Sequence, residues 1–424
     1  MTETTIRIPE ALIAKTISRG LSRVNAISEG GPGWTRPSYS ALESQAHAVI
    51  EEEAVALGLE IRRDAAGNLF ATLPGRDRAP ERALHIGSHL DTVSQGGAYD
   101  GQAGVMGGLA VITALRDMGL TPATDIVLTV TRAEESVWFP VSYAGSRAGM
   151  GRLAPEDFDA PRADTGRSLA DHMAEAGFDP DAVRNITPPT PARFLEFHIE
   201  QGPILDEAGE AYAIVEAVRG GLRYRAAEVH GTWAHSGGVP QNHRADAMLA
   251  MAELICAMDS AWTRLTAEGH DLTVTFGKVD AATPQHAMAK VAGHVGFVLD
   301  MRSADVASLE AADEVLRAEI ARIEAARPGI RFDLGTQSRS APARLSSSMA
   351  AMVAGGATAQ GDAPRRMLSG GGHDAAAFSA AGWDAVMVFI RNWNGSHCPE
   401  EAMDEADLCR AVAAVVHAIA AEVA

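Results

Sequence analysis

The strongest constraint on the fold is a strand, a helix and a second strand that follow one another between residues 83 and 135. "ALHIGSHLDTV" is an apolar run that predicts a buried strand ending near His89, and "GVMGGLAVITALRDMG" predicts a helix with Gly119 at its C-cap. "DIVLTVTRAEE" predicts another apolar strand. A helix between two buried strands at this spacing indicates a parallel βαβ unit.

The flanking segments extend this α/β pattern. Residues 41–57 are Ala/Glu-rich and amphipathic, which predicts a helix, and residues 59–75 predict a hairpin with its turn at 66–68. "LEFHIEQGPILDEAG" predicts a strand and a turn, and "GGHDAAAFSAAGWDAVMVFI" a helix followed by a strand. The C-terminal "AVAAVVHAIAAEVA" is typical of a docked final helix. We therefore expect a mixed, largely parallel sheet flanked by helices.

The pattern of predicted secondary structure changes from about Ala213. A strand region is followed by a helix at about 244–268, two strands in "LTVTFGKVDAA" and "GHVGFVLDMRS", and a helix at about 305–325. This order predicts a compact α+β insert at 213–330, of roughly 115 residues, within the usual size range of domains. The first domain would then consist of residues 1–212 and 331–424.

Composition narrows the class of protein. The 424 residues carry 36 Lys and Arg against 55 Asp and Glu, a formal net charge of −19. This acidity disfavours nucleic-acid partners and anionic membrane surfaces, both of which are bound through basic clusters. The three cysteines form no CxxC pair, the start "MTETTIRIPE" does not resemble a signal peptide, and no apolar run has membrane-spanning length. We expect a cytoplasmic protein.

Metal-ligating residue types lie at the predicted ends of several strands. In open α/β sheets, ligands bind beyond the carboxyl ends of the strands. Imidazoles and carboxylates suit borderline metals, and two ions about 3.5–4 Å apart need a bridging carboxylate. The pattern therefore predicts a metal site. Its candidates are His89, Asp91, Asp100, Glu134, Glu135, His198 and His397.

The spacing of neighbouring candidate residues suggests a different chemical role for each. His89 and Asp91 lie two apart, so on a strand both face one side, where one can bind metal while the other holds the imidazole. Of the adjacent Glu134 and Glu135, one could ligate metal while the other transfers protons. Each signal has a structural alternative: a satisfied core histidine, a turn aspartate, a solvated acidic pair. Their recurrence at successive strand ends favours the metal site.

Several motifs follow one another along the chain: "GSHLDTVSQGGAYDGQAGV", "EESVWFPVSYAGSR", "EFHIEQGPILDE", "GTWAHSGGVPQNHRADA", "LDMRS", "SGGGHDAAAF" and "GSHCPEE". Together they resemble the amidase/hydantoinase/carbamoylase branch of the M20 dinuclear-metal peptidases, and the resemblance covers nearly the whole sequence. That branch includes N-carbamoyl-L-amino-acid hydrolases, allantoate amidohydrolases and β-ureidopropionases. The resemblance implies a zinc-peptidase-like catalytic domain, an inserted lid and dimerisation domain, and a homodimer.

The resemblance also implies a cofactor and residue roles. Two divalent ions per subunit are expected, Zn²⁺ or Mn²⁺, with Co²⁺ and Ni²⁺ also compatible. Asp100 would bridge both ions and Glu134 would be the general base. His89 and His198 would ligate one or the other ion, Glu135 and His397 would ligate the second, and Asp91 would support catalysis beside His89.

Further positions match substrate contacts of the family. His235 would reach the partner subunit's active site and stabilise the oxyanion, although it could instead cap a turn beside Gly237. Arg302 would contact substrate, although it could instead pair with Asp300 or Asp305. The remaining expected substrate contacts are Gln201, Gly371 and Gly372, with His373 as a supporting residue.

Two departures from the family pattern bear on the substrate. The usual "N-x-I-P-G" stretch is "AKVAG", so Ala289 replaces an asparagine that grips a carboxylate, and His286 or Lys290 could substitute for it. The usual "EEGSRF" is "EESVWF", which places Val137 and Trp138 where a polar stretch is common. We expect a bulkier and more apolar pocket.

The resemblance implies hydrolysis of a non-peptide C–N bond in a small acidic ureido or amide substrate such as an N-carbamoyl amino acid. Metal-activated hydroxide would attack, with Glu134 as general base. Three alternatives are kept: a hydrolytic deaminase acting on an electron-poor amino-arene or amidine, an N-acyl amino acid or dipeptide hydrolase, and a non-catalytic metal-binding module. The complete set of ligand positions and the retained Glu134 disfavour the last.

Overall fold

The chain folds into two compact units. The computed structural model describes residues 7–423. Unit 1 runs up to Glu216 and resumes at Arg344, and unit 2 comprises Ala217–Ala343. Each unit contains its own hydrophobic core, as separate domains do.

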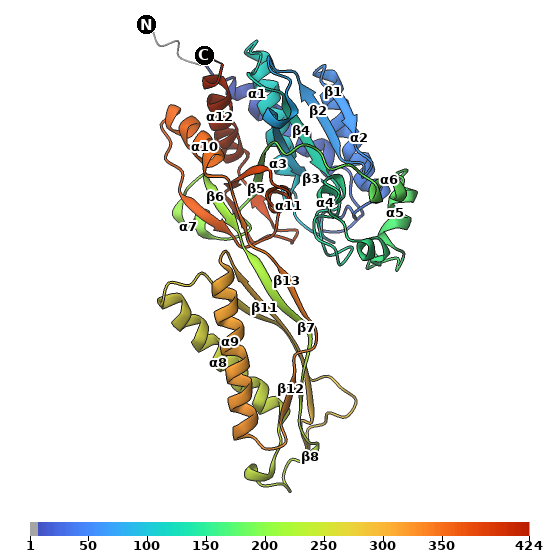
Figure 1. The fold of residues 1–424 in the computed structure, drawn as a ribbon, viewed down its shortest axis with the longest axis vertical. Helices are drawn as coiled ribbons and strands as arrows, with labels where there is room; N and C mark the ends of the chain where they lie inside the picture. The colour runs from blue at the N-terminus through green and yellow to red at the C-terminus, as the bar shows by residue number, and fades with distance from the viewer. Residues whose placement is uncertain (1–6, 424) are drawn as a thin grey trace. The chain divides into compact units, whose positions relative to one another are not determined.

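A nine-stranded sheet forms the centre of unit 1 (Figure 1). The strands β3, β4, β5 and β16 are mutually parallel, whereas β1, β2 and β6 join the sheet antiparallel. The predicted mixed, largely parallel α/β sheet is confirmed. The strand order is β1 (Glu60–Arg63), β2 (Leu69–Leu73), β4 (Ile126–Thr131), β3 (Leu84–His89), β5 (Arg193–Ile199), β16 (Asp384–Ile390), β6 (Tyr212–Val218) and β14 (Ala343–Arg344), with β15 (Arg366–Ser369) beside β6.

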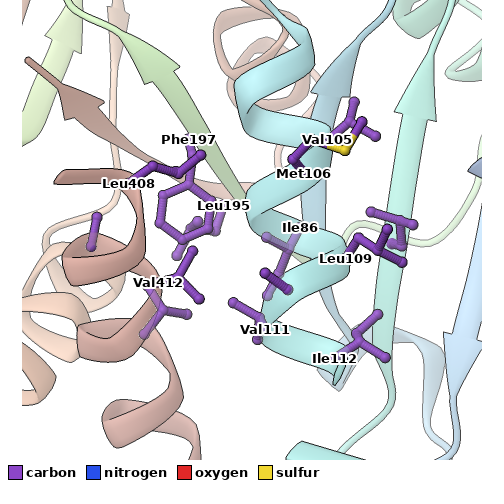
Figure 2. Packing of buried hydrophobic residues seen from close by; sticks show 14 of the residues in the cluster. Ile86, Val105, Met106, Leu109, Val111, Ile112, Leu195, Phe197, Leu408 and Val412 are labelled. Atoms are coloured by element: carbon purple, nitrogen blue, oxygen red, sulfur yellow. The ribbon is translucent and has the colours of Figure 1, made fainter. Parts of the chain in front are cut away.

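The helix α3 (Gln102–Asp117) supplies the right-handed type of crossover that parallel strands require, between β3 and β4. It is buried along nearly its whole length and packs on β3 and β5 on one side and on α1 (Glu10–Asn25) and α12 (Glu405–Ala421) on the other. Figure 2 shows side chains of α3, β5 and α12 meeting in this core, among them Leu109, Phe197 and Val412.

Glycines at the start of α3 allow it to lie close to the sheet. A Cβ atom on Gly104 would overlap the backbone carbonyl of Phe197 in β5. Gly101, the residue before the helix, has φ +68°, and a Cβ there would overlap the imidazole ring of His89. The glycine-rich stretch after β3 is therefore a close packing of helix, sheet and imidazole, which only a residue without a side chain permits.

Shorter elements complete unit 1. The helices are α2 (Ala41–Ala56), α4 (Ala144–Gly149), α5 (Leu169–Glu175), α6 (Pro180–Arg184), α7 (Ile204–Ala208), α10 (Ser347–Ala359) and α11 (Asp374–Ala380). The short strands β17 (Asn392–Trp393) and β18 (Ala402–Met403) pair with each other. Within residues 7–423, no helix combines the length and apolar character that a bilayer crossing requires.

Unit 2 is an antiparallel sheet with two helices on one face. The strands β12 (Arg331–Asp333), β7 (Gly220–His230), β11 (His294–Ser303) and β9 (Thr273–Asp280) lie in that order, and β13 (Gln337–Ser340) also pairs with β7. The helices α8 (Ala247–Ala267) and α9 (Val306–Ala326) run side by side (Figure 1). A two-residue ladder joins β8 (Ala234–His235) to β10 (Lys290–Val291).

The alternating pattern of β11 separates the two faces of the unit 2 sheet. Val295, Phe297 and Leu299 are buried in the core with α8 and α9, whereas the residues between them are half-exposed. Period-two alternation of this kind is typical of an antiparallel sheet with one covered face. The other face of the sheet consequently carries the polar side chains.

One sequence expectation needs correction. We expected a single strand region from about Ala213, but the structure has two strands there, β6 and β7, separated at Arg219. β6 pairs with β16 in the unit 1 sheet, and β7 lies in the unit 2 sheet. The run "AIVEAVRGGLRYRAAEVH" is apolar throughout its first half, so its pattern does not reveal where one sheet ends. The predicted domain roles stay predictions.

The core around α3 generates a stability prediction. Leu109→Ala should lower the free energy of unfolding by about 2–5 kcal/mol, because it removes a buried side chain that its neighbours only partly replace. Val55→Ala, at an exposed helical position, should change it by about 0.5 kcal/mol or less. Chemical denaturation followed by circular dichroism compares the two, and equal effects would contradict the packing described here.

The approach of Gly101 to His89 generates a second prediction. Gly101→Ala combines a positive φ with overlap on the imidazole, whereas Gly119→Ala has a similar φ of +66° and no atom within 4 Å of its Cβ. We expect Gly119→Ala to cost about 1–3 kcal/mol of stability for backbone strain alone, and Gly101→Ala to cost more. Denaturation midpoints of the two variants measure the difference, and matching midpoints would argue against the close contact.

Candidate metal centre

The carboxyl ends of four adjacent parallel strands bring the candidate ligands together. Along the sheet the order is β4, β3, β5 and β16. Glu134 and Glu135 follow β4, His89 ends β3, His198 lies near the end of β5, and His397 follows β16. Residues separated by up to 308 positions (397 − 89) therefore meet at one edge. This is the location at which open α/β sheets bind ligands.

Asp100 lies at the centre of this group. Its Oδ1 is 3.5 Å from His89 Nε2 and 3.2 Å from His198 Nε2, while its Oδ2 is 3.4 Å from His397 Nε2. Glu135 Oε1 is 3.7 Å from the same His397 nitrogen. Two three-residue sets thus share Asp100, and the ligand atoms of each set lie within 4.8 Å of one another. One carboxylate oxygen faces each set, as a carboxylate that bridges two ions requires.

Backbone carbonyls orient two of the imidazoles. His89 Nδ1 lies 3.0 Å from the carbonyl oxygen of Asp91, and His198 Nδ1 lies 2.9 Å from that of Ile199. A carbonyl oxygen only accepts hydrogen bonds, so each Nδ1 carries a proton and donates it. In both rings Nε2 is consequently the nitrogen turned toward Asp100. Such outer hydrogen bonds fix the tautomer of metal-binding histidines.

The Asp91 side chain connects the β3 end to the β4 end. Its two oxygens accept the backbone N–H groups of Glu134 and Glu135, both at 3.1 Å, and the Ser38 hydroxyl at 2.6 Å. Its Oδ1 also lies 3.3 Å from His89 Nδ1. One buried carboxylate therefore positions an imidazole and both glutamates. This arrangement matches the supporting position expected for Asp91, and its catalytic role stays a prediction.

A buried ion pair shapes the turn that carries the two glutamates. The chain leaves β4 through Ala133, which has φ +50°, and the Ala133 N–H donates to Glu43 at 2.9 Å. Glu43 also pairs with Arg132 at 3.0 Å, and both side chains are almost fully buried. Glu134 and Glu135 consequently lie beyond the strand. Sequence reasoning missed Glu43, which lies in a helix far from the motifs.

Burial of several acids sets the electrostatics of the centre. Burial raises the pKa of Glu134 well above its ordinary value, and burial together with Asp100 raises the pKa of Glu135 to about 8. Burial also acts to raise the pKa of Asp100, but His198, His397 and His89 hold it well below its ordinary value. Divalent cations among these groups would favour the carboxylate forms, because a nearby positive charge stabilises an ionised acid.

The donor set fits a pair of borderline divalent ions. Three imidazoles and two carboxylates, one of them shared, form a mixed nitrogen and oxygen set. Such sets accommodate Zn²⁺, Mn²⁺, Co²⁺ and Ni²⁺ alike. Gly101 packs against the His89 imidazole at a distance that excludes a side chain at position 101. The residues present therefore suit the metal pair that the sequence predicted.

Three expected substrate contacts lie at the same edge of unit 1. Gln201 Nε2 donates to Asp100 Oδ2 at 2.8 Å and lies 3.3 Å from His397 Nε2. A Cβ on Gly371 would be 2.8 Å from the Gln201 side-chain oxygen, and one on Gly372 would overlap the Tyr143 hydroxyl. Both glycines thus border the group around Asp100, and their contact with substrate stays a prediction.

The expected residues His235 and Arg302 lie in unit 2. His235 Nδ1 accepts the backbone N–H groups of Gly237 and Gly238 at 3.2 and 3.0 Å, so it caps the following turn. Arg302 donates to Asp300 from Nε and Nη2 at 2.9 and 2.8 Å. The structural alternatives considered for both side chains are thus present. Neither contact precludes a second role, and their substrate contacts stay predictions.

His286, one suggested replacement for the missing asparagine, also lies in unit 2. Its Nε2 lies 3.1 Å from the carbonyl oxygen of His294, and its ring centroid is 4.7 Å from that of Trp233. Its contact with substrate stays a prediction. Lys290, by contrast, is exposed and forms a cross-strand pair with His235 on the β8–β10 ladder.

Two buried acids support the centre and were not assigned by sequence reasoning. Glu196, two residues before His198 on β5, accepts from the Ser88 hydroxyl at 2.7 Å and from the Ala375 N–H at 2.8 Å. Its spacing of two from a candidate ligand is a signal that could have identified it. Glu401 accepts the N–H of Asp100 at 3.2 Å, and its place in the quoted "GSHCPEE" motif was the available signal.

His373 occupies the supporting position expected for it. Its ring lies 4.3 Å from the His198 ring, in an edge-to-face arrangement, and its Nε2 is 2.9 Å from the Ser369 hydroxyl. Burial holds the pKa of His373 well below its ordinary value, so its ring is neutral. It packs against a candidate ligand without joining either three-residue set.

An apolar wall borders His397. A cavity of about 500 Å³ is lined by Val93, Val137 and Trp138 together with His397. The Trp138 ring is held in place because its Nε1–H donates to the Thr92 carbonyl at 2.7 Å. Val137 is half-exposed toward solvent. Ser94, Ala163 and Asp164 complete the lining, so two residues of the "EESVWF" departure border a cavity beside a candidate metal ligand, and its use by substrate stays a prediction.

Comparison with known proteins identifies the family. The model of peptidase family M20/M25/M40 matches residues 85–421. The chain is 31% identical to an N-carbamoyl-L-amino acid amidohydrolase of Geobacillus stearothermophilus, over 91% of this chain and 93% of the relative. It is 30% identical to an allantoate amidohydrolase of Bacillus subtilis, over 90% of each chain.

A solved structure agrees with this assignment. A hydantoinase/carbamoylase family amidase from Burkholderia multivorans superimposes with a TM-score of 0.85 at 26% identity, covering 97% of this chain and 98% of the other. The family match, the relatives and the structural neighbour point to one group. The chain therefore belongs to peptidase family M20/M25/M40, within its amidase, hydantoinase and carbamoylase branch.

Proposed function

We propose that this protein hydrolyses a non-peptide C–N bond of a small acidic ureido or amide substrate, with two divalent metal ions as cofactor. The observation that carries the proposal is the position of Asp100, whose two oxygens face different ligand sets. The relatives named for N-carbamoyl-L-amino acids and for allantoate support this substrate class.

The proposed ligand assignment follows the two sets. His89, Asp100 and His198 would hold one ion, and Asp100, Glu135 and His397 the other. A pair of such ions, when bound, would lower the pKa of water toward about 7 and so supply a nucleophile at neutral pH. Zn²⁺ and Mn²⁺ are the preferred candidates, and Co²⁺ and Ni²⁺ suit the same donors.

Glu134 is the proposed general base. Its backbone N–H is fixed on Asp91, as is that of the ligand Glu135, so its side chain starts from a defined position beside the metal sets. It belongs to neither set of ligands. Its carboxylate would take a proton from water and later deliver it to the leaving nitrogen, the usual pair of tasks for one acid in hydrolysis.

Residues of unit 2 complete the proposal. His235 would stabilise the oxyanion, and Arg302 would contact the substrate, in a homodimer formed through this unit. Lys290 is the proposed replacement for the missing asparagine at Ala289, because the residue is exposed and its backbone pairs with that of His235 across the β8–β10 ladder. An ammonium group can bind a substrate carboxylate as a point charge, whereas alanine offers no donor.

The apolar wall favours a substrate that carries an apolar or aromatic group. Val93, Val137 and Trp138 offer such a group a surface beside His397. An aromatic ring could pack on this wall, so we retain a second candidate function. It is a hydrolytic deaminase that releases ammonia from an electron-poor aromatic amine. Both reactions would use the same water-activating residues and differ in the carbon attacked.

Glu134→Gln tests the assignment of the base. The variant should bind both ions as the wild type does, because Glu134 is outside the ligand sets, and should lose activity by about 100- to 10,000-fold. Glu135→Gln is the matched control, since loss of a proposed ligand should reduce the metal count as well. Elemental analysis and initial rates measure both effects. Near-normal turnover in Glu134→Gln would remove it from the base role.

A substrate panel separates the candidate functions. Metal-loaded protein would be incubated with N-carbamoyl amino acids, allantoate, N-acyl amino acids and nitro-substituted aminoarenes, and ammonia, carbon dioxide and amino acids would be measured. We expect turnover of N-carbamoyl amino acids, with aromatic side chains preferred. Trp138→Ala should reduce that preference by about 10-fold, the scale of one lost apolar contact.

Each other result selects an alternative. Ammonia from aminoarenes without carbon dioxide identifies a deaminase, and turnover restricted to N-acyl substrates identifies an acyl amino acid hydrolase. Removal of metal with a chelator should abolish whichever activity is found, and Zn²⁺ or Mn²⁺ should restore it. A chain that binds metal but converts no member of the panel would be a non-catalytic metal-binding module.

A further inference from the structure

A second group of metal-ligating side chains lies in unit 2, apart from the site described above. Glu228 and His230 belong to β7, and His294 begins β11. All three are half-exposed, and one ligand atom of each lies within 4.8 Å of the others. They lie on the polar face of the sheet, because the residues between and beside them, Val229 and Val295, are buried in the core. We call this group the β7–β11 cluster.

Strand register explains why the three side chains converge. Glu228 and His230 are two apart on β7, so they face the same side of the sheet. His294 is the direct antiparallel partner of His230, and directly opposed side chains lie closest together. The two imidazole rings are 5.5 Å apart between centroids. The backbone therefore brings the three ligands together without any loop rearrangement.

Distances within the β7–β11 cluster match those around a small cation. Glu228 Oε2 is 3.1 Å from His230 Nε2, and Glu228 Oε1 is 3.4 Å from His294 Nε2. Ligand atoms bound at about 2.0–2.1 Å in a tetrahedral zinc site lie roughly 3.3 Å apart. Both imidazoles turn the same nitrogen, Nε2, toward the carboxylate.

The strand partner of Glu228 leaves room for an ion and its water. That partner is Gly296 on β11, which in turn pairs with Asp280 on β9. A Cβ on Gly296 would have its nearest neighbours at 3.9 and 4.0 Å, so the space above this glycine is not filled by other atoms. Two imidazoles and one carboxylate with an open fourth position form a donor set that zinc accepts in proteins.

The charged residues around the β7–β11 cluster do not make it positively charged. Asp333, the partner of Glu228 on β12, adds a carboxylate to the same row, and Asp280 adds another on the far side of Gly296. Arg331 is the partner of His230 on β12, and Lys278 lies 3.1 Å from Asp280. Arg331 lies 3.9 Å from Asp333, so each neighbouring acid has a cation beside it, and Glu228 leaves one net negative charge beside the imidazoles.

We propose that the β7–β11 cluster is a mononuclear site for a borderline divalent cation, with Glu228, His230 and His294 as its protein ligands and water completing the shell. Zn²⁺ is the ion that this donor set fits best, and Cu²⁺, Ni²⁺ and Co²⁺ share its chemistry. The ion would link β7 to β11 and stabilise unit 2. This inference does not rest on the proposed hydrolase activity.

A metal count on the full chain tests the proposal. Metal-stripped protein would be equilibrated with buffered Zn²⁺, freed of excess ion and analysed for Zn²⁺ per chain. The wild type should hold one more ion than the His230→Asn/His294→Asn double variant. His243→Asn, which removes an exposed histidine of the same unit outside the cluster, should keep the wild-type count. Equal counts in all three proteins would overturn the proposal.

A second variant and a structural readout guard against misfolding of the double variant. Glu228→Gln keeps the shape of the side chain but removes the anionic ligand, and should weaken the extra ion's affinity by at least about tenfold. Crystals soaked in Zn²⁺ and measured at the zinc absorption edge should show an anomalous peak among the three side chains. Peaks confined to the centre around Asp100 would rule out the site.

The count also remains distinct from the test of the proposed function. The measured quantity is a difference of one ion between variants of the same chain, and it requires no turnover. A protein without hydrolase activity could still show this difference of one ion, and an active hydrolase could lack the difference. Thermal unfolding provides an independent check, because Zn²⁺ should raise the melting temperature of the wild type more than that of the double variant.

Discussion

The candidate centre depends on one buried carboxylate that serves two groups of ligands at once. Asp100 lies among three imidazoles, and each of its oxygens faces a different set. Burying an acid is costly unless its charge is balanced, and the neighbouring glutamates add to the negative charge. In this protein the imidazoles balance the charge of Asp100, and burial raises the pKa values of the two glutamates, so bound cations would favour the ionised forms of all three acids. The proposed chemistry and the proposed base follow from that arrangement.

The parallel sheet converts distant sequence positions into neighbours. β4, β3, β5 and β16 are adjacent, and each delivers a side chain at its carboxyl end. The strands and α3 are buried and regular. The candidate ligands lie at the carboxyl ends of the strands or in the loops that follow them. Gly101 and Gly104 allow the helix to approach closely enough for His89 to be enclosed. The packing of α3 on the sheet thus also sets the position of a candidate metal ligand.

Sequence reasoning predicted the elements that carry periodic apolar patterns and the polar residues that end them. It predicted β3, α3 and β4, and it predicted that His89, Asp100 and His198 would come together, because metal-ligating residue types lie at or just after the ends of strands there. It missed Glu43, since a buried acid in an amphipathic helix has no distinguishing pattern, and it did not separate β6 from β7, since the chain stays largely apolar across the boundary between them. The β7–β11 cluster was invisible because it depends on register between strands 64 residues apart (294 − 230).

The Asp91 carboxylate has a consequence for how such a site can change over time. It binds the amide groups of Glu134 and Glu135 and approaches the His89 ring. A shift of one glutamate is therefore transmitted to the other and to the imidazole across the sheet. Natural variation at this position would displace the proposed base Glu134 and the candidate ligand Glu135 in the same step, so the two glutamates are expected to change position together.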